Sequence, residues 1–335
     1  MALKIAINGF GRIGRLVYRA ILENDDKDIN VVCINDLGPP NSNAHLLKFD
    51  TIHGILPHNV EVEGDNILVD HRPVKVTAEK DPLKLPWEEL GVDIALECTG
   101  LFTSKTAASA HLNAGAKKVL ISAPASEADI TVVYGVNSDK LTPDHRIVSN
   151  ASCTTNCLAP VVHVLHEALG IERGFMTTIH SFTGDQRTVD TLHGDLHRAR
   201  TASVSMIPTS TGAARAVGLV LPELEGKIDG TSIRVPTPNV SVIDFKFVPT
   251  KATDIDSVND AIKDASEGKL KGILSTNELP LVSVDFNHNP HSSIFDLAET
   301  QVIESQFVRV MSWYDNEWGF SNRMIDTAKA MGNLL

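Results

Sequence analysis

The spacing of apolar residues predicts strands that alternate with helices in the first half of the chain. Lys4–Asn8 is an apolar run of strand length, apolar positions between 13 and 21 repeat at helical spacing, and Ile29–Asn35 predicts a second strand. The same order returns further along, in 92–97, 105–114 and 118–122. This rhythm is typical of a parallel sheet whose strands are connected by helices.

A glycine-rich turn joins the first predicted strand to the first predicted helix. It reads Gly9-Phe10-Gly11-Arg12-Ile13-Gly14, and Asp36 follows at the end of the next strand. In such a unit the glycines serve a tight turn, a close approach of backbone to a pyrophosphate, and close helix packing. The carboxylate of Asp36 can accept hydrogen bonds from a ribose and would repel a 2′-phosphate, so NAD is favoured over NADP. The alternative is that Asp36 only begins the turn Gly38-Pro39-Pro40.

The second half predicts a different architecture. Strand-like runs are found at 174–181, 240–247, 281–284 and 307–310, with helical spacing at 257–265 and in a last segment that ends near 331. Short β-like runs between 41 and 80 indicate an insertion beside the first sheet. We therefore expect an α/β fold: a Rossmann-type doubly wound parallel sheet domain at 1–150, completed by a C-terminal helix at about 317–335, and an α+β domain with a mostly antiparallel sheet at 151–316.

Two polar residues lie at the carboxyl ends of further predicted strands of the first half. Thr99 follows the strand at 92–97, and Ser122 ends the strand at 118–122. Ligands bind at this edge of open parallel sheets, so both residues are candidates for cofactor contacts.

The segment Ser149–Cys157 combines a thiol and several hydroxyls with a predicted helix start. Asn150 and Ser152 are N-cap types, which puts Cys153 in the first turn, where unpaired amides and the helix dipole favour an anion. We expect the pKa of the Cys153 thiol to be lowered and the thiolate to be a nucleophile. A buried structural cysteine is the alternative, and we interpret Cys157 in that way, although oxidation could join the pair.

His180 is the predicted partner of this thiol. The strand at 174–181 carries it near its end. An imidazole with a pKa near neutrality can hold a thiolate as an ion pair and shuttle a proton. Alone, the histidine would be interpreted as structural; beside an activated cysteine it indicates covalent catalysis.

Hydroxyl and guanidinium groups of the second half predict an anion site. Pro208–Arg215 supplies hydroxyls at another predicted helix start, Arg234 lies on a predicted strand, and 183–205 is a long polar segment. Arginine offers a bidentate fork to phosphate oxygens. Together these residues predict a small phosphorylated substrate, although each alone would be interpreted as structural or solvated.

Composition limits the classes of partner. The 335 residues suffice for two domains, and 30 Lys+Arg against 42 Asp+Glu give a net charge of −12, which does not support nucleic-acid binding. The 4 cysteines fit neither a disulfide scaffold nor a zinc pattern, so we expect reduced thiols and no metal. Without a secretory signal or a long apolar run, we expect a cytoplasmic protein that does not interact with membranes.

Four motifs resemble those of the phosphorylating glyceraldehyde-3-phosphate dehydrogenases. They stand at 8–15, 149–157, 234–241 and 313–319, so the resemblance runs nearly from end to end. It implies oxidation of glyceraldehyde 3-phosphate by NAD and inorganic phosphate to 1,3-bisphosphoglycerate. By the family's pattern, Cys153 forms a thiohemiacetal and then a thioester that phosphate cleaves, with His180 as the base.

The resemblance also implies binding residues and an assembly. Together with the motif analysis, it gives as contacts of NAD Gly9, Phe10, Gly11, Arg12, Ile13, Gly14, Asp36, Lys80, Thr99, Ser122 and Asn316. The residues expected around the substrate and the attacking phosphate are Ser152, Thr154, Thr183, Arg198, Thr211, Gly212 and Arg234. A homotetramer is expected, with the loop after Thr183 packing near a neighbour's cofactor.

Two departures and two alternatives qualify this interpretation. The segment 190–193 lacks a proline often found in strictly NAD-dependent members, which leaves NADP use open, and Phe320 stands where many relatives have tyrosine. An erythrose-4-phosphate dehydrogenase would use the same cysteine and histidine on a longer aldehyde. A non-catalytic NAD-binding protein that acts through a partner surface would need neither residue.

Overall fold

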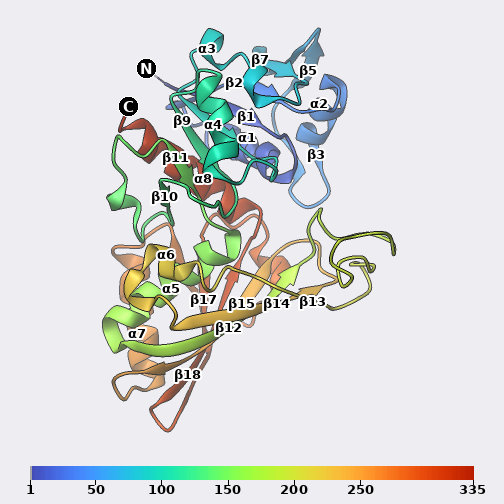
Figure 1. Ribbon diagram of the computed structural model, residues 1–335. Coiled ribbons are helices and arrows are strands. Elements are labelled where there is room, and N and C mark those ends of the chain that lie inside the picture. Colours follow the sequence, from blue (N-terminus) through green and yellow to red (C-terminus); the bar gives the residue numbers. More distant parts are fainter. Residues whose placement is uncertain (1) are drawn as a thin grey trace. The chain divides into compact units, whose positions relative to one another are not determined.

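The computed structural model describes residues 2–335, which form two compact units (Figure 1). The first unit comprises Met1–Val132, Ser138–Ala151 and Ser321–Leu335. The second comprises Val133–Asn137 and Ser152–Phe320. The last helix, α8 (Trp318–Gly332), begins in the second unit and continues in the first.

The first unit is built on a nine-stranded sheet with the order β10-β11-β9-β8-β1-β2-β7-β6-β5. Its strands are β1 (Leu3–Asn8), β2 (Ile29–Asn35), β5 (Val60–Glu63), β6 (Asn66–Val69), β7 (Arg72–Thr77), β8 (Ile94–Glu97), β9 (Lys118–Ile121), β10 (Ile130–Thr131) and β11 (Ile147–Ser149). All neighbours from β10 to β7 pair in parallel, and β6 and β5 add an antiparallel edge. The run β7-β2-β1-β8-β9-β11 has the order of a doubly wound dinucleotide-binding sheet, which confirms the predicted fold class of this half.

Burial explains why these segments form parallel strands. Every residue of β8 and β9 is buried, as expected for strands covered on both faces. The helices of this unit are α1 (Arg12–Glu23), α2 (Pro40–Lys48), α3 (Trp87–Leu90) and α4 (Lys105–Asn113), with 3-10 turns at Pro82–Lys84 and Ser138–Lys140 and a small hairpin of β3 (Phe49–Asp50) and β4 (Gly54–Ile55). In α1 the apolar face is buried, including Leu16, Val17 and Ile21.

The expected insertion between 41 and 80 is partly wrong. Its strands β5, β6 and β7 belong to the main sheet, because β7 pairs in parallel with β2 and extends it, and only β3 and β4 form a separate hairpin. The segment also holds α2, which begins with Pro40 in its first turn, a position where proline's missing N–H costs nothing.

The second unit is built on a seven-stranded sheet with the order β13-β14-β12-β15-β18-β17-β16. Its strands are β12 (Ile171–Ser181), β13 (Ile207–Thr209), β14 (Ile228–Val235), β15 (Ser241–Pro249), β16 (Leu274–Asn277), β17 (Ser293–Ile303) and β18 (Phe307–Tyr314). Only β12–β14 and β16–β17 pair in parallel among the described strands, so the prediction of a mostly antiparallel sheet is confirmed.

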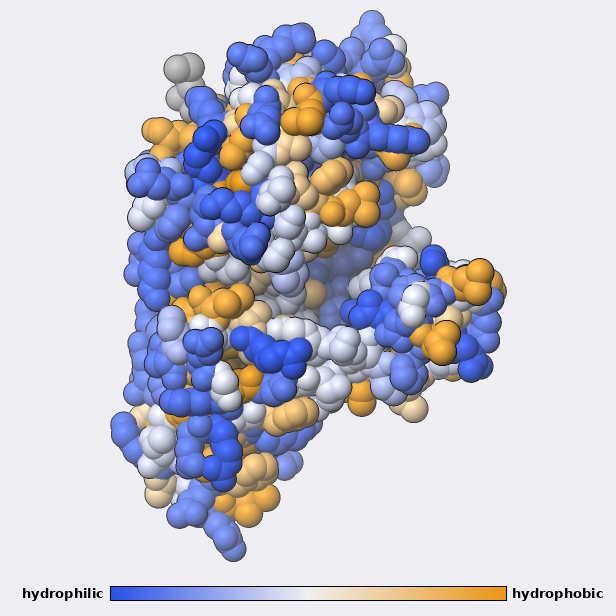
Figure 2. Space-filling model, viewed as in Figure 1, coloured by the Kyte–Doolittle hydropathy of each residue, from blue (hydrophilic) through white to orange (hydrophobic). Residues whose placement is uncertain are grey.

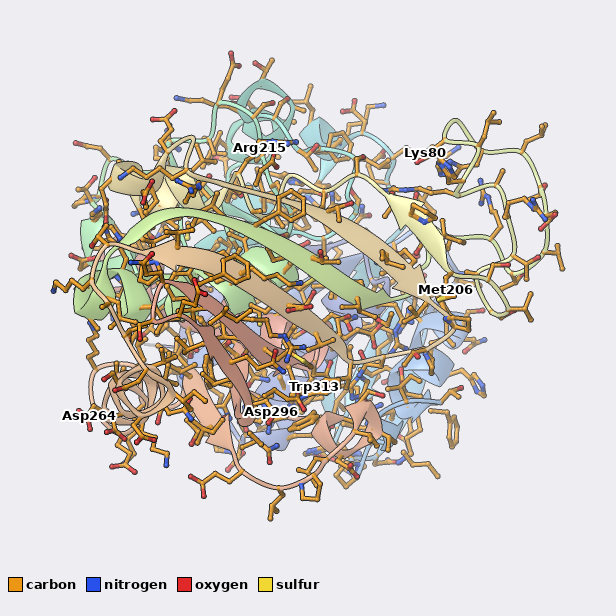
Figure 3. All side chains as sticks on the ribbon, turned by 90° about the horizontal axis from the view of Figure 1, so that it is seen from below. Lys80, Met206, Arg215, Asp264, Asp296 and Trp313 are labelled. Carbon is orange, nitrogen blue, oxygen red and sulfur yellow. The ribbon has the colours of Figure 1, made fainter. Side chains whose placement is uncertain are left out.

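The helices α5 (Cys153–Leu169) and α7 (Ile255–Glu267) pack on each other and on this sheet, and α6 (Val217–Val220) is a single turn. Figure 3 shows Trp313 of β18 beside Asp296 of β17, and the Trp313 indole donates to the Asp296 carboxylate at 2.9 Å.

Two predicted elements of the second unit are wrong. Residues 281–284 are not a strand: the Asp285 carboxylate accepts from the Val282 amide at 2.9 Å and closes a 3-10 turn at Ser283–Phe286. Residues 208–215 are not a helix start, because Thr209 ends β13 and the short helix begins only at Val217. Pro222–Leu224 forms a further 3-10 turn.

Candidate active site

The glycine-rich turn between β1 and α1 has three glycines in three different settings. Gly9 has a φ of +91°, which favours glycine, and a Cβ there would lie 2.6 Å from the Thr99 amide nitrogen. A Cβ on Gly14 would lie 2.1 Å from the Gly9 carbonyl oxygen, so the helix packs directly on the turn. Gly11 differs, because a Cβ there would meet nothing within 4 Å. The space over Gly11 at the start of α1 therefore fits a pyrophosphate that approaches the backbone closely.

Asp36 stabilises the glycine-rich turn and can still accept hydrogen bonds from a ribose. Its two carboxylate oxygens accept from the Phe10 amide at 2.8 Å and from the Gly38 amide at 3.0 Å. A carboxylate oxygen has a second lone pair, so Asp36 keeps acceptor capacity for hydroxyl groups.

A pocket opens beside Asp36 at the carboxyl ends of the strands. Five predicted cofactor residues line it: Gly9, Gly11, Asp36, Lys80 and Thr99. It is also lined by seven residues that were not predicted: Asn8, Asn35, Leu37, Glu79, Cys98, Leu101 and Phe102. They lie at or just after the ends of β1, β2, β7 and β8, and, apart from Asn8 in the motif at 8–15, none of them belongs to a motif that the sequence analysis could recognise.

Other predicted cofactor residues lie outside this pocket. Phe10 and Gly14 are buried, and Ile13 is half-buried in the first turn of α1. Arg12 forms an ion pair with Asp50. Burial alone would raise the pKa of the Asp50 carboxyl, but Arg12 and two backbone amides outweigh it and lower that pKa to about 2. The Ser122 amide donates to the Glu97 carbonyl.

Cys153 stands at the first position of α5. Ser152 is the N-cap residue, and its hydroxyl accepts from the Thr155 amide at 3.0 Å, which confirms the predicted helix start. The Sγ atom of Cys153 lies 3.5 Å from Nε2 of His180, so the structure brings the two predicted catalytic residues together.

His180 reaches the thiol from β12 and is fixed from behind. Its Nδ1 atom lies 2.7 Å from the Ser181 carbonyl oxygen and 2.8 Å from Nη1 of Arg234. Arg234 is the residue opposite His180 in the register of β12 and β14, which explains why the two side chains meet. Tyr314 packs edge-on against the imidazole, with ring centroids 5.8 Å apart.

The pKa values of this pair differ from the prediction. Burial raises the pKa of the Cys153 thiol, although the Arg234 charge and hydrogen bonds at Thr154 oppose this. Burial, and then the Arg234 charge, lower the pKa of His180 to about 3. The expected thiolate with an imidazole near neutrality is therefore wrong for the free protein, because desolvation outweighs the helix terminus, and the pair consists of a neutral thiol and a neutral imidazole.

The predicted anion-binding residues Arg198, Thr183, Thr211, Gly212 and Arg234 all belong to the second unit. Arg198 donates to the Thr209 hydroxyl at 2.9 Å and to the Asp185 carboxylate at 2.7 Å. Thr183 donates from its amide to Gln186 at 2.8 Å. Thr211 and Gly212 lie in the turn after β13, where the Thr211 hydroxyl accepts from the Ala213 amide at 3.1 Å. Arg234 is half-buried, and its buried Nε atom has no hydrogen-bond partner among the described residues.

The Thr154 hydroxyl has a structural partner instead. It lies 2.8 Å from the Tyr314 hydroxyl, which is also 2.9 Å from the Thr178 hydroxyl. Tyr314 therefore ties α5 to β12 below the thiol.

Asn316 lies in the second unit on a turn held by a buried carboxylate. Asp315 accepts from the side chain of Asn239 and from the amides of His288, Glu317 and Trp318. The side-chain oxygen Oδ1 of Asn316 accepts from the hydroxyls of Ser181 at 2.8 Å and Ser241 at 2.9 Å. Its oxygen is thereby used, which leaves the amide nitrogen as the group for a ligand.

The four cysteines are free thiols, and Cys157 is buried with its Sγ 3.4 Å from the Ser293 hydroxyl. Within residues 2–335, no helix is both long and apolar enough to cross a membrane.

Comparisons with known proteins agree with the geometry. A model of the glyceraldehyde 3-phosphate dehydrogenase NAD binding domain matches residues 3–105, and a model of the C-terminal domain matches residues 152–316. Relatives named glyceraldehyde-3-phosphate dehydrogenase are 67% identical over 334 residues in Xanthobacter flavus and 62% identical over 335 residues in Cereibacter sphaeroides, with 100% of both chains covered in each case. A relative of that name in Geobacillus stearothermophilus is 56% identical over 329 residues, 98% of each chain. The chain with this sheet order and this thiol–imidazole pair therefore belongs to the glyceraldehyde-3-phosphate dehydrogenase family.

Proposed function

We propose that this chain oxidises glyceraldehyde 3-phosphate through a thioester on Cys153, with His180 as the proton acceptor. The chain is an NAD-dependent, phosphorylating oxidoreductase of its family, and 1,3-bisphosphoglycerate is the product. The observation that carries the proposed mechanism is the 3.5 Å contact between the Cys153 sulfur and His180 Nε2 at the start of α5.

Proton transfer begins the reaction. His180 acts as a base at Nε2 when its proton is on Nδ1 and is directed at the Ser181 carbonyl. In that tautomer Nδ1 accepts no hydrogen bond, and Nη1 of Arg234 donates instead to the same carbonyl, at 3.0 Å. Nε2 takes the thiol proton as the sulfur attacks the aldehyde carbon, and the product is a thiohemiacetal on Cys153. The Arg234 charge and the amides at the start of α5 stabilise the negative charge that develops on sulfur.

NAD, when bound, supplies the hydride acceptor. Gly9, Gly11, Asp36, Lys80 and Thr99 would hold its adenosine and pyrophosphate, and the free amide nitrogen of Asn316 would hold the nicotinamide amide. Nε2 of His180 returns the thiol proton to the former carbonyl oxygen of the thiohemiacetal and takes the hydroxyl proton again when hydride leaves the carbon, so that a thioester remains on Cys153. A thioester keeps enough reactivity for phosphate to attack, whereas a free carboxylate would not.

Two anions have to be bound near the sulfur. We assign the phosphate of the substrate to Thr183 and Arg234, and the attacking phosphate to Ser152, Arg198, Thr211 and Gly212. Thr154 is left out of this set, because its buried hydroxyl contacts Tyr314. The guanidinium groups of Arg198 and Arg234 suit this role, because each presents a planar set of donors to phosphate oxygens. Arg198 is held by the Asp185 carboxylate, so we expect an entering phosphate to compete with that contact.

We further propose that the first unit is the NAD-binding domain and the second the catalytic and oligomerisation domain of a cytoplasmic homotetramer. The segment 183–206 supports an assembly, because it exposes large apolar side chains: Val189, Leu192, Leu196, Val204 and Met206. Figure 2 shows apolar side chains on the lobe that this segment forms.

NADH formation with phosphate present or omitted tests the function. We expect continuous turnover of glyceraldehyde 3-phosphate with NAD and phosphate, and at most one NADH per chain without phosphate. Erythrose 4-phosphate serves as the comparison aldehyde. Equal turnover with and without phosphate, or faster turnover of erythrose 4-phosphate, would contradict the proposal.

A further inference from the structure

A buried polar chain lies beneath the pocket of the first unit. Glu97 at the end of β8 is 1% exposed, and His111 of α4 and Trp87 of α3 are fully buried. Among the described residues, no Lys or Arg pairs with the Glu97 carboxylate, and its one basic neighbour is the imidazole of His111 at 2.9 Å. A buried carboxylate without a cation needs several hydrogen-bond donors.

The state of His111 follows from Trp87. The indole Nε1–H of Trp87 lies 3.0 Å from Nδ1 of His111. An indole N–H can only donate, so Nδ1 carries no proton and the ring is the neutral form with its proton on Nε2. Nε2–H therefore donates to Glu97, which requires the carboxylate to accept.

Three further donors complete the shell of Glu97. Oε2 also accepts from the side-chain amide of Asn8 at 2.6 Å. Oε1 accepts from the backbone amide of Thr99 at 2.8 Å and from the Thr99 hydroxyl. Glu97 thus accepts from four donors. Two of the residues that donate to it, Asn8 and Thr99, line the pocket.

The direction of hydrogen bonding continues across the sheet. Because the side-chain amide nitrogen of Asn8 donates to Glu97, the side-chain oxygen of Asn8 faces Asn35. It accepts from the side-chain nitrogen of Asn35 at 2.7 Å. The carbonyl oxygen of Asn35 in turn accepts from the Glu79 amide at 2.9 Å. Asn8, Asn35, Glu79 and Thr99 all line the pocket and come from or adjoin β1, β2, β7 and β8.

We propose that Glu97 and His111 are positioning residues for the nucleotide: the carboxylate orients Asn8 and Thr99, and through Asn8 also Asn35, and the neutral imidazole holds the carboxylate. His111 has a second link to the pocket, since Phe102 packs edge-on against it with centroids 6.2 Å apart. This inference rests on the proposed function only in that the adenosine half of NAD occupies the pocket.

Glu97→Gln tests the role of the carboxylate. A carboxamide has one acceptor oxygen, so its NH2 group must face two of the four donors, and the floor has to rearrange. We expect the Kd for NAD and the Kd for ADP-ribose to rise by the same factor, about tenfold or more, with the loss in the KM for NAD rather than in the rate at saturating NAD. Isothermal titration with both nucleotides and steady-state kinetics measure this.

A pair of substitutions at His111 separates positioning from packing. His111→Gln keeps an N–H that can reach Glu97, whereas His111→Leu fills similar space without a donor. We expect His111→Gln to retain most of the nucleotide affinity and His111→Leu to lose it. Val119→Ala is the control, because Val119 is buried in a separate cluster of the same unit with Ile121 and Ile147; it should lower the unfolding temperature and leave both Kd values unchanged.

The outcomes distinguish the two proposals. Wild-type affinity for ADP-ribose in Glu97→Gln and His111→Leu, or equal loss in His111→Gln and His111→Leu, would overturn the positioning role. If Glu97→Gln does not fold, the His111 pair decides alone. If the wild-type protein itself binds neither nucleotide, the proposed function fails instead.

Discussion

Two neutral groups in a buried setting form the reactive pair of this protein. Desolvation disfavours both the thiolate of Cys153 and the imidazolium of His180. The charge of Arg234 favours the thiolate and further disfavours the imidazolium. Charge therefore appears only when the proton moves from sulfur to nitrogen during attack. The same environment keeps the resting thiol from reacting as a free thiolate.

Replacement of the sulfur is the most direct residue-scale prediction. In Cys153→Ser a hydroxyl replaces the thiol, and because the serine pKa lies far above that of cysteine, we expect turnover to fall by on the order of 10⁴ or more. NAD affinity should stay within about twofold, since Cys153 belongs to no part of the nucleotide pocket. NADH formation and NAD titration measure the two effects, and retained turnover would rule out the thioester.

His180 also gives the protein a predictable pH dependence of stability. Its folded pKa of about 3 lies below the ordinary value of 6.5, so between these values the unfolded chain binds a proton that the folded chain does not. The free energy of unfolding must therefore fall as the pH drops through this window, by on the order of 2 kcal/mol at pH 5. We expect His180→Asn to lose less stability between pH 7 and pH 5 than the wild type in urea unfolding at one protein concentration. An equal loss in both proteins would contradict the buried, neutral imidazole.

Sequence alone could identify Cys153 and His180, because capping residues and strand ends are local signals. It could not give the direction of their pKa shifts, since burial depends on Tyr314, Thr178 and Arg234, which come from three other positions in the sheet. The hydroxyls of Ser181 and Ser241 that orient Asn316 were missed for the same reason. Serine has no distinctive pattern until the chain is folded.

The glycine-rich turn shows how one short element divides its tasks among residues. Gly9 makes the turn possible, Gly14 lets α1 pack on it, and Gly11 leaves open space at the helix start. Gly9 and Gly14 are thus needed for folding, and Gly11 is needed for ligand binding.

Substitution by alanine should separate these tasks. Gly14→Ala would place a Cβ 2.1 Å from the Gly9 carbonyl, and we expect a loss of about 1–3 kcal/mol in stability. Gly11→Ala meets nothing in the free protein, so its stability should stay within about 0.5 kcal/mol while NAD affinity falls at least about tenfold. Thermal unfolding and NAD titration of both variants measure this; a stable Gly11→Ala with wild-type affinity would show that no pyrophosphate lies there.

Element-scale errors in the sequence interpretation have identifiable causes. The alternation at 281–284 is that of a strand, yet one carboxylate, Asp285, closes a turn there. Hydroxyls at 208–215 suggested a helix cap, but Ile207–Thr209 pairs with β14 through tertiary contacts that no local pattern reveals. Long segments such as α5 and β12 were predictable because they carry local signals, such as the N-cap residue Ser152 at the start of α5.

At the scale of the whole molecule, the sheet orders account for where the chemistry can occur. The first sheet reverses its strand order next to β1, and ligands of doubly wound sheets bind at such a point. The second sheet brings His180 and Arg234 together through the parallel pairing of β12 and β14. The alternation of strands with helices predicted the first sheet, and strand-like runs predicted the second. Neither pattern predicted the parallel pair β12–β14, because the pairing of distant strands is not local information.

The exposed apolar segment 183–206 predicts an assembly. Leu192 is 93% exposed, more than a side chain of this kind is expected to be in a monomer without a partner. We expect Leu192→Asp to shift the mass measured by light scattering from four chains to fewer. Leu279→Asp, at a site that is 62% exposed outside the segment, is the control and should leave the mass unchanged. A wild-type mass of one chain would contradict the proposed tetramer.

The central claim, that Cys153 carries the acyl group, is tested most directly by intact-protein and peptide mass spectrometry after rapid acid quench. With glyceraldehyde 3-phosphate and NAD but no phosphate, the account predicts one phosphoglyceryl group per chain, located on the peptide that contains Cys153, and its loss when phosphate is added before the quench. Full NADH formation with no adduct on Cys153, or an adduct that phosphate does not remove, would contradict it.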